Sequence, residues 1–230
     1  MKLVLFDIDG TLLWTNGAGR RAIGRALAAE IGREPPLDGY RFDGKTDPQI
    51  VIELLMISGD PNPHEPERVR AVCERYVTHL DEELAATPGR TVVLPGVAAL
   101  LDALEQEEGI VLGLLTGNVA AGARLKLRAA GLDGSRFPIG AYGSDSSVRT
   151  ELPPVAFARA RDRFGVAPNP ADAVIIGDTP ADVACGLGAG ARTVGVATGS
   201  YAVAELRAAG AHHAFRDFSN LAQVLPAVLG

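Results

Sequence analysis

Short, nearly continuous apolar runs recur along the chain, and segments with apolar residues at helical spacing lie between them. The clearest runs cover residues 2–6, 110–115, 173–176 and 193–196, and weaker ones cover 138–142 and 214–215. Such runs are typical of strands that are buried on both faces of a sheet. The helical segments cover 97–107, 119–130, 154–164 and 180–187. Alternating strands and helices of these lengths predict an α/β fold with a doubly wound parallel sheet.

One long segment interrupts this alternation. After the run at 2–6, no convincing strand begins before Ile110, and the sequence between them is typical of helices separated by proline-containing loops. These helices are expected at 18–31, 47–58 and 65–86. A crossover between parallel strands needs far fewer residues. We therefore expect a helical cap at 17–88, inserted into a core made of 1–16 and 89–230. Gly17, Gly19 and the Pro88-Gly89 pair are candidate hinges.

The composition excludes several classes of protein. Apolar residues make up 47% of the 230 positions and the net charge is −6, which is typical of a folded globular chain. No apolar stretch is long enough for a membrane span, and no signal peptide is recognisable. The acidic balance argues against a general nucleic-acid binder. Two cysteines alone cannot build a disulfide framework or a zinc site, so a reducing, cytoplasmic location is expected.

The strongest chemical signal is Asp7-Ile8-Asp9-Gly10-Thr11, which directly follows the first predicted strand. Ligands bind at the carboxyl ends of the strands in open parallel sheets. Asp7 and Asp9 can point at one centre, where two buried anions need a cation between them or a proton on one of them. The pair therefore indicates a divalent metal. A solvated Asp-Gly turn is the alternative interpretation.

Two further strand ends carry polar groups. Asp178 follows the run at 173–176, and Asp182 lies in the first turn of the next predicted helix. Together with the first aspartates they could form an all-oxygen site that suits Mg²⁺, although an N-capped helix also favours these residues. Thr116-Gly117-Asn118 follows the run at 110–115, where a hydroxyl and free main-chain N–H groups could bind an anion. The same three residues also make an ordinary turn.

In this order, the three segments resemble motifs I, II and IV of the haloacid dehalogenase superfamily. The matching positions are Asp7-x-Asp9-Gly10-Thr11, then Thr116, then Gly177-Asp178-x-x-x-Asp182. The long helical insertion after motif I is similar to the C1-type cap of that superfamily. The resemblance covers essentially the whole chain and implies a Rossmann-like core that carries the catalytic groups.

The resemblance also implies a role for each matching residue. Asp7 would be the nucleophile that forms an aspartyl-phosphate, and Asp9 would act as general acid and then as general base. Mg²⁺ would bind Asp7, the main-chain carbonyl of Asp9, and Asp178, while Asp182 would orient a metal-bound water or support the ligands. The phosphoryl oxygens would be held by the residues of motif II, Thr116, Gly117 and Asn118.

One motif departs from the superfamily pattern. Motif III is usually a lysine in a Lys-Pro-x-Pro run, but here Leu152 stands before Pro153. The nearest cation is Arg149, which we expect to bridge Asp7 and the phosphate, because arginine makes forked contacts to phosphate. A surface arginine near a turn is the alternative interpretation. Lys126 is a poorer candidate, because its position in the middle of a predicted helix indicates a solvated side chain.

The cap is expected to select the substrate. Arg20 lies just past the first candidate hinge and could face the mouth of the site. Lys45 lies in a turn before a predicted helix, with Thr46 or Asp47 as the N-cap, and could project towards the substrate. A solvated lysine in a capping turn is an equally good interpretation.

Other activities fit these residues less well. The G-x-G-x-x-A match that begins at Gly17 lies too far past the strand end to hold a dinucleotide. Within the superfamily, Asp9 and Asp178 argue against a dehalogenase. Asp9 also argues against a phosphonate hydrolase, although Lys45 keeps that activity open as a Schiff-base lysine. A sugar phosphomutase would retain all four motifs and is the main alternative. A non-catalytic binding protein would be expected to lack a key carboxylate, and none is missing.

We therefore expect a Mg²⁺-dependent phosphomonoester hydrolase that acts on a small phosphorylated metabolite, similar to phosphoglycolate phosphatases. A closing cap would exclude water and bulky partners. Phosphoglycolate, a sugar phosphate and a nucleoside monophosphate all remain candidate substrates. The expected fold is compatible with a monomer and with a homodimer.

Overall fold

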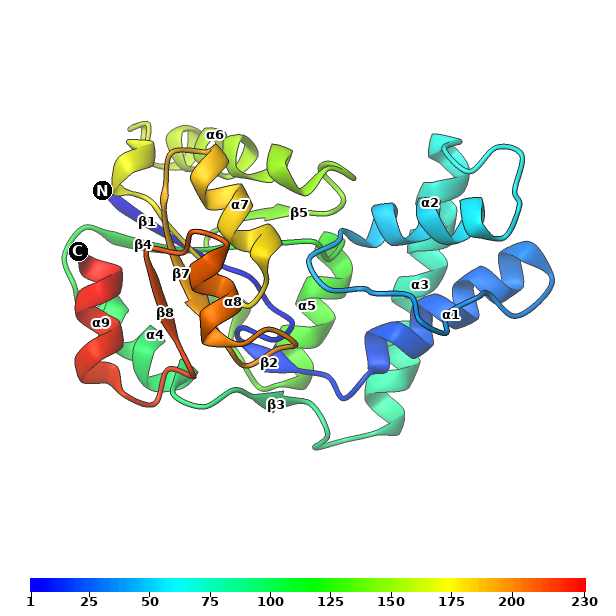
Figure 1. The fold of residues 1–230 in the computed structure, drawn as a ribbon, viewed down its shortest axis with the longest axis horizontal. Coiled ribbons are helices and arrows are strands. Elements are labelled where there is room, and N and C mark those ends of the chain that lie inside the picture. Colours follow the sequence, from blue (N-terminus) through cyan, green and yellow to red (C-terminus); the bar gives the residue numbers. More distant parts are fainter.

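The computed structural model describes residues 1–230, which form two parts (Figure 1). The larger part, the core, is built around a six-stranded parallel sheet with the order β5-β4-β1-β6-β7-β8. Its strands are β1 (Lys2–Phe6), β4 (Ile110–Thr116), β5 (Ile139–Tyr142), β6 (Val174–Gly177), β7 (Arg192–Val196) and β8 (His213–Phe215). All six occur where apolar runs predict strands. The prediction of an α/β fold with a doubly wound parallel sheet is therefore confirmed.

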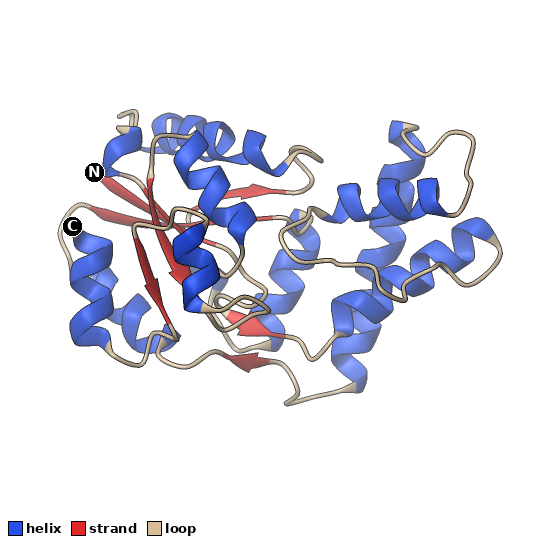
Figure 2. Cartoon of the chain, viewed as in Figure 1, coloured by secondary structure: helices blue, strands red, loops and turns tan.

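Helices cover both faces of this sheet (Figure 2). They are α4 (Val97–Glu105), α5 (Ala120–Ala129), α6 (Leu152–Phe164), α7 (Pro180–Gly188), α8 (Val203–Ala208) and α9 (Leu221–Leu229). Strand β1 shows why the strands are apolar throughout. Val4 and Phe6 pack in a cluster with α4, α5 and α9, whereas Leu3 and Leu5 pack with α6 and α7. Successive side chains of a strand point to opposite faces, so a doubly covered strand needs apolar residues on both.

The smaller part is built from the first three helices of the chain, and we call it the cap. Its helices are α1 (Ala18–Ile31), α2 (Asp47–Ile57) and α3 (Pro66–Ala86), and they lie beside the core at the right of Figure 1. These helices enclose an apolar core of their own, in which Leu27, Leu54 and Leu80 are fully buried. Val119, the N-cap residue of α5, joins this cluster and thereby connects the cap to the core.

A two-stranded antiparallel ribbon joins the two parts, and the sequence pattern does not predict it. The ribbon consists of β2 (Leu13–Trp14) and β3 (Val92–Val93), so the chain leaves and re-enters the core side by side. Strands of two residues are too short for periodicity to reveal them. Gly17 follows β2 with a φ of 79°, which glycine adopts readily. Gly19, the other candidate hinge, lies inside α1.

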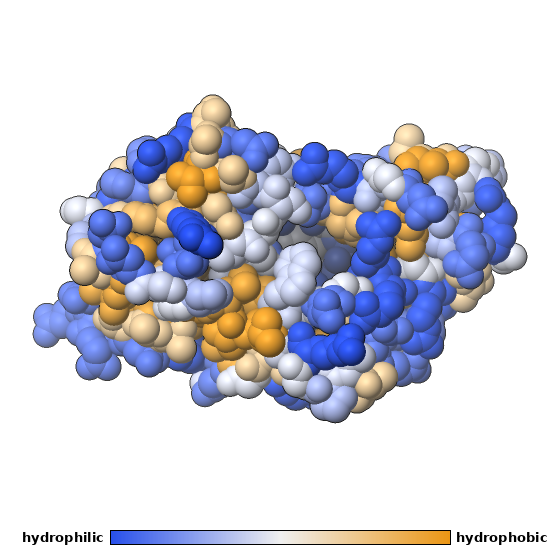
Figure 3. Space-filling view, turned by 60° about the horizontal axis from the view of Figure 1, so that its bottom comes forward, coloured by the Kyte–Doolittle hydropathy of each residue, from blue (hydrophilic) through white to orange (hydrophobic).

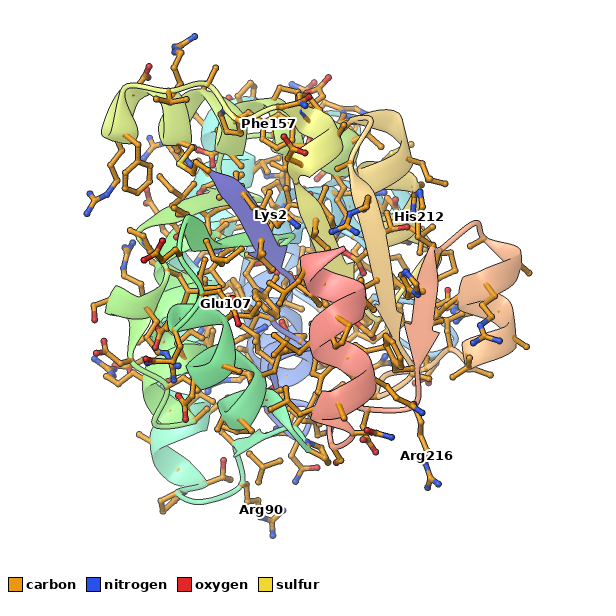
Figure 4. The ribbon with its side chains drawn as sticks, turned by 90° about the vertical axis from the view of Figure 1, so that its left-hand side faces the viewer. Lys2, Arg90, Glu107, Phe157, His212 and Arg216 are labelled. Atoms are coloured by element: carbon orange, nitrogen blue, oxygen red, sulfur yellow. The ribbon has the colours of Figure 1, made fainter.

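Helices α8 and α9 are also missing from the predicted pattern. Only Leu206 is buried in α8, and α9 contains Pro226, a residue that disfavours helix interiors. Even so, α9 packs on the sheet, and its end lies close to the start of β1, where the ammonium of Lys2 donates to the carbonyl of Leu229 (Figure 4). None of the helices combines the length and apolar character that crossing a bilayer requires.

Candidate active site

Polar groups from three neighbouring strands meet at one edge of the sheet. Strand β1 lies between β4 and β6, and after β5 the chain crosses from one side of β1 to the other. Ligands of such sheets bind at this switch point, outside the carboxyl ends of the strands. Asp7 follows β1, Thr116 ends β4 and Asp178 follows β6. The fold thus brings these three predicted residues to one cavity.

Three carboxylates crowd this edge with almost no exposure to solvent. Asp7, Asp178 and Asp182 are 7%, 4% and 2% exposed, and one carboxylate oxygen of each lies within 4.8 Å of the others. Burial raises the pKa of Asp7 to about 6, although the nearby guanidinium of Arg149 lowers it. Burial, together with the charges of Asp182 and Asp7, raises the pKa of Asp178 well above its usual range. A proton or a cation must therefore offset the negative charge of this cluster.

The donor set of this cluster fits Mg²⁺. Carboxylate oxygens are preferred ligands of this hard cation, which needs only one or two carboxylates from the protein. Three negative charges face a single guanidinium, so a divalent cation would bring the cluster to neutrality. The place of Asp178 depends on two glycines. A Cβ atom added to Gly10 would lie 2.4 Å from Oδ2 of Asp178, and one added to Gly199 would lie 1.8 Å from the same oxygen. A larger residue at either position would therefore displace this carboxylate.

Asp182 differs from the other two carboxylates because both of its oxygens already have partners. Its Oδ1 accepts a hydrogen bond from the guanidinium of Arg149. Its Oδ2 accepts from the main-chain N–H and the hydroxyl of Thr179, at 3.0 and 2.7 Å. With Thr179 it forms a capping box at the start of α7. These contacts suit a residue that orients Arg149 better than they suit a direct ligand of a metal.

Arg149 lies among these carboxylates. It begins the short 3-10 helix Arg149–Glu151, immediately before α6, and its side chain is 6% exposed. Its Nη2 lies 3.2 Å from Oδ2 of Asp7 and also contacts Asp182. Burial alone would lower the pKa of Arg149, but the carboxylates of Asp182 and Asp7 raise it above its usual value. A permanently charged group therefore stands beside the predicted nucleophile.

Asp9 takes part in a second polar network. Its Oδ2 accepts hydrogen bonds from the side-chain amide of Asn118 at 2.8 Å and from the ammonium of Lys126 at 2.6 Å. Lys126 also donates to Oδ1 of Asn118 at 2.6 Å, and Asn118 donates to the hydroxyl of Thr116 at 2.8 Å. The network holds the carboxylate of Asp9 beside the turn of motif II, while its side chain stays 35% exposed.

The prediction that Lys126 is solvated is wrong. Its side chain is only 5% exposed, because it shares the buried face of α5 with Gly122, Ala123 and Leu127. Residues three and four positions apart lie on the same face of a helix. A charged residue in a helix is normally exposed unless a partner is present. Here the partners are Asp9 and Asn118, and only the fold brings Asp9 to α5.

The loop before α2 closes over the site from the cap. The main-chain N–H of Asp47 donates to the carbonyl of Gly117 at 2.7 Å. Thr46, the N-cap of α2, donates through its hydroxyl to the carbonyl of Ser147 at 2.8 Å. A Cβ atom at Gly117 would lie 2.1 Å from the carbonyl oxygen of Lys45, so this close approach requires glycine. The cap therefore contacts the very turn in which phosphate binding is predicted.

The two predicted cap residues line the same cavity, but their charged groups have partners. Arg20 donates to the main-chain carbonyls of Leu37 at 2.6 Å and Tyr40 at 3.4 Å. Lys45 donates to Glu53 at 2.5 Å and lies over the ring of Tyr40, with its Nζ 4.2 Å from the ring centroid. Both side chains therefore shape the loop before α2.

Two buried cap residues also line the cavity, although no sequence motif points to them. Asp47 is 7% exposed and accepts a hydrogen bond from the main-chain N–H of Val119 at 2.8 Å. Burial raises the pKa of Asp47 to about 6, although the charge of Lys126 lowers it. Tyr76, in α3, is 1% exposed. In the sequence, Asp47 resembles a helix-start residue and Tyr76 a core residue, so only the fold reveals their place.

Most of these groups line one cavity of about 410 Å³ between the core and the cap, whereas Asp182 does not line it. Figure 3 shows the surface hollowed between the two parts of the molecule. One wall comes from the carboxyl ends of β1, β4 and β6, and the other from α1, α3 and the loop before α2. The volume is that of a small-molecule site.

Comparison with known proteins identifies the family. A family model described as a haloacid dehalogenase-like hydrolase matches residues 1–190. This chain belongs to the haloacid dehalogenase-like hydrolase family. The match includes the residues at all three strand ends described above and confirms the resemblance that the motifs indicate. It also confirms that this family member is an enzyme of the hydrolase class.

Two curated relatives resemble the chain over most of its length. The protein named "Probable phosphatase IndB" from Dickeya dadantii is 31% identical over 210 residues, which cover 90% of this chain and 86% of the relative. A phosphoglycolate phosphatase from Rhodospirillum rubrum is 28% identical over 225 residues, which cover 96% of this chain and 89% of the relative.

Solved structures share the fold. A hydrolase from Pseudomonas syringae has a TM-score of 0.73 at 23% identity, with 100% of this chain and 99% of that chain covered. A mutant of CbbY from Rhodobacter sphaeroides, crystallised in complex with xylulose bisphosphate, has a TM-score of 0.75 at 21% identity, with 96% of each chain covered. Both likenesses support the α/β fold and extend over core and cap together.

The buried carboxyl of Asp47 predicts a pH dependence of stability. Its pKa is about 6 in the folded protein, against 3.8 for an ordinary aspartate. Between these values the folded state binds more protons than the unfolded state, so the free energy of unfolding falls as the pH rises from about 4 to about 6. Asp47→Asn should remove about 2–3 kcal/mol of this fall. Urea unfolding in EDTA at several pH values measures the effect.

The exposed Asp102 provides the control for this experiment. Asp102→Asn should leave the slope of stability against pH unchanged. Equal slopes for the wild type and Asp47→Asn would contradict the assignment of a raised pKa to Asp47.

Proposed function

We propose that this hydrolase is a Mg²⁺-dependent phosphomonoesterase that works through an aspartyl-phosphate on Asp7. The observation that carries the proposal is the arrangement of Asp7, which lies 3.2 Å from the buried guanidinium of Arg149 and beside the carboxylate of Asp178. This arrangement supplies a nucleophile, a cation site and a fixed positive charge, which phosphoryl transfer requires. The names of both curated relatives support the same reaction.

The residues at the strand ends would divide the binding of metal and phosphate between them. Asp7, Asp178 and the main-chain carbonyl of Asp9 would hold Mg²⁺, which when bound neutralises charge on the phosphoryl oxygens. Arg149 would orient Asp7 and contact the phosphoryl group, with Asp182 holding the guanidinium in place. The remaining phosphoryl oxygens would be held by the hydroxyl and N–H groups of motif II, in Thr116, Gly117 and Asn118.

Asp7 and Asp9 would perform the two chemical steps. The carboxylate of Asp7 attacks phosphorus, and the bond from phosphorus to the alcohol oxygen breaks as Asp9 gives that oxygen a proton. Asp9 then takes a proton from a water molecule, which attacks phosphorus, releases phosphate and regenerates the Asp7 carboxylate. Lys126 and Asn118 hold Asp9 at its Oδ2, so its position does not depend on substrate.

The size of the site supports a small phosphorylated metabolite as substrate. A cavity of about 410 Å³ closed by the cap accommodates a phosphate ester of a few carbon atoms. Phosphoglycolate, on which one relative acts by name, is the first candidate. A Schiff-base mechanism is not favoured, because Lys45 is ion-paired with Glu53 and such a mechanism needs a free amine. A sugar phosphomutase would convert a hexose 1-phosphate without releasing phosphate.

Asp7→Asn tests the nucleophile. The amide cannot attack phosphorus, so kcat for phosphate release from a panel of phosphorylated metabolites should fall by at least about 10³-fold. In EDTA the melting temperature should not fall, because the change removes one buried negative charge from the cluster. Substantial residual turnover would contradict the assignment of Asp7.

Arg149→Ala tests the cation beside the nucleophile. Loss of this guanidinium should raise KM and lower kcat/KM by about 10²-fold or more, because phosphate then meets uncompensated carboxylates. Arg149→Lys retains the charge and should recover part of the loss. Arg161→Ala, at a position 58% exposed, is the matched control and should change kcat/KM little. Equal effects of the two alanine variants would place the phosphate-binding cation elsewhere.

Mg²⁺ binding should stabilise the protein in a pH-dependent way. Metal ligands must be deprotonated, and burial raises the pKa of both Asp7 and Asp178. Saturating Mg²⁺ should therefore raise the melting temperature clearly at pH 7.5 and much less at pH 5. The increase should be lost in Asp178→Asn, and EDTA should abolish phosphate release by the wild type. An equal increase in Asp178→Asn would show that Mg²⁺ binds at another site.

A further inference from the structure

Tyr76 is a buried polar residue that the proposed reaction does not use. It lies in α3 of the cap, its side chain is 1% exposed, and it lines the cavity. Its hydroxyl has no hydrogen-bond partner in the protein. The fully buried side-chain atoms that lack a partner are Oγ of Ser58 and Nε of Arg149, so the Tyr76 hydroxyl is open to the cavity. Burial raises the pKa of Tyr76 well above its usual value, so the hydroxyl keeps its proton and can donate it.

Lys126 presents a second unused donor at the same corner of the cavity. An ammonium has three donors. Two of them are directed to Asp9 and Asn118, both at 2.6 Å, and the third has no partner in the protein. A Cβ atom built on Gly19 would lie 3.4 Å from Nζ of Lys126 and 3.6 Å from the hydroxyl of Tyr76. The two donors therefore border one small space, which Gly19 leaves open.

We propose that Tyr76 and Lys126 form a subsite for an oxygen atom of the substrate's alcohol half. This oxygen is a hydroxyl or carboxylate carried by the carbon next to the esterified carbon. The inference rests on the proposed phosphomonoesterase activity and narrows its substrate class. Neither residue belongs to the motifs that the family resemblance assigns.

The geometry sets both the type of group and its place. An ammonium and a protonated tyrosine can both donate, so the ligand atom between them must be an acceptor. Lys126 lies 2.6 Å from Asp9, which would protonate the leaving oxygen. Hydrogen bonds are about 2.8 Å long. These lengths allow an oxygen bound by Lys126 to lie as close to the leaving oxygen as two oxygens on adjacent carbons lie to each other.

Three two-carbon phosphate esters test this subsite because they differ only at the second carbon. The second carbon is a methyl group in ethyl phosphate, bears a hydroxyl in 2-hydroxyethyl phosphate and is the carboxylate carbon in phosphoglycolate. We expect kcat/KM of the wild type to be higher by about tenfold or more for both oxygen-bearing esters than for ethyl phosphate, since a hydrogen bond to a charged donor has at least this effect. Of the two, the faster ester identifies the group that the subsite prefers.

Two variants connect this preference to the subsite. Tyr76→Phe removes the hydroxyl and should lower the ratio of kcat/KM for the preferred ester over ethyl phosphate by about fivefold or more. Gly19→Ala places a methyl group between the two donors, at ordinary contact distances, and should lower the same ratio. Alanine favours helix more than glycine does, so the melting temperature of Gly19→Ala should not fall. A lowered ratio without a lowered melting temperature separates loss of the subsite from damage to the fold.

Matched controls come from the core. Tyr142→Phe alters a tyrosine that does not line the cavity, and Gly188→Ala alters a glycine of α7 whose added Cβ would meet no atom within 4 Å. Both should keep the wild-type ratio. If all three esters are hydrolysed at equal kcat/KM, or if neither cavity variant changes the ratio, the subsite is wrong while the phosphomonoesterase stands. If no ester of any kind releases phosphate, both proposals are wrong.

Discussion

Mutual repulsion among buried carboxylates at the carboxyl ends of β1 and β6 is the constraint on which the site depends. Asp7, Asp178 and Asp182 approach one another within 4.8 Å in a region almost without water. The pKa values of Asp7 and Asp178 are raised as a consequence. One guanidinium, that of Arg149, offsets part of this charge, and the deficit that remains matches a divalent cation. The electrostatics of the sheet edge thus require a proton or a cation, and a divalent metal would meet this requirement.

The cap completes the site that the core begins. The loop before α2 lies on motif II. The main-chain N–H of Asp47 donates to the carbonyl of Gly117, and the main chain of Lys45 closely approaches the same glycine. Lys45 of the cap is neutralised inside the cap by Glu53. Unused donors are left where Tyr76 of the cap meets Lys126 of the core. In the proposed subsite, selection of the substrate would therefore depend on both parts of the chain.

Much of the fold could be predicted because both faces of the parallel strands are covered. Val4 and Phe6 serve one face of the sheet and Leu3 and Leu5 the other, so β1 is an uninterrupted apolar run. Apolar runs likewise located the other five strands. Asp7, Thr116 and Asp178 could then be recognised because they are polar residues at the ends of three of these strands. The ribbon of β2 and β3 escaped prediction, because pairing between segments so distant in the chain leaves no local pattern.

By itself, the sequence determined the strands of the main sheet, the helices α1 to α7 and the polar groups at the strand ends, since burial and local periodicity are properties of neighbouring residues. Only the tertiary structure decided which charges lie together. It placed Lys126 against Asp9 instead of in solvent, buried Asp47 under the N-terminus of α5, and left the hydroxyl of Tyr76 without a protein partner. The physical reason is that the cost of burying a charge or a hydroxyl depends on partners that the chain brings from far away.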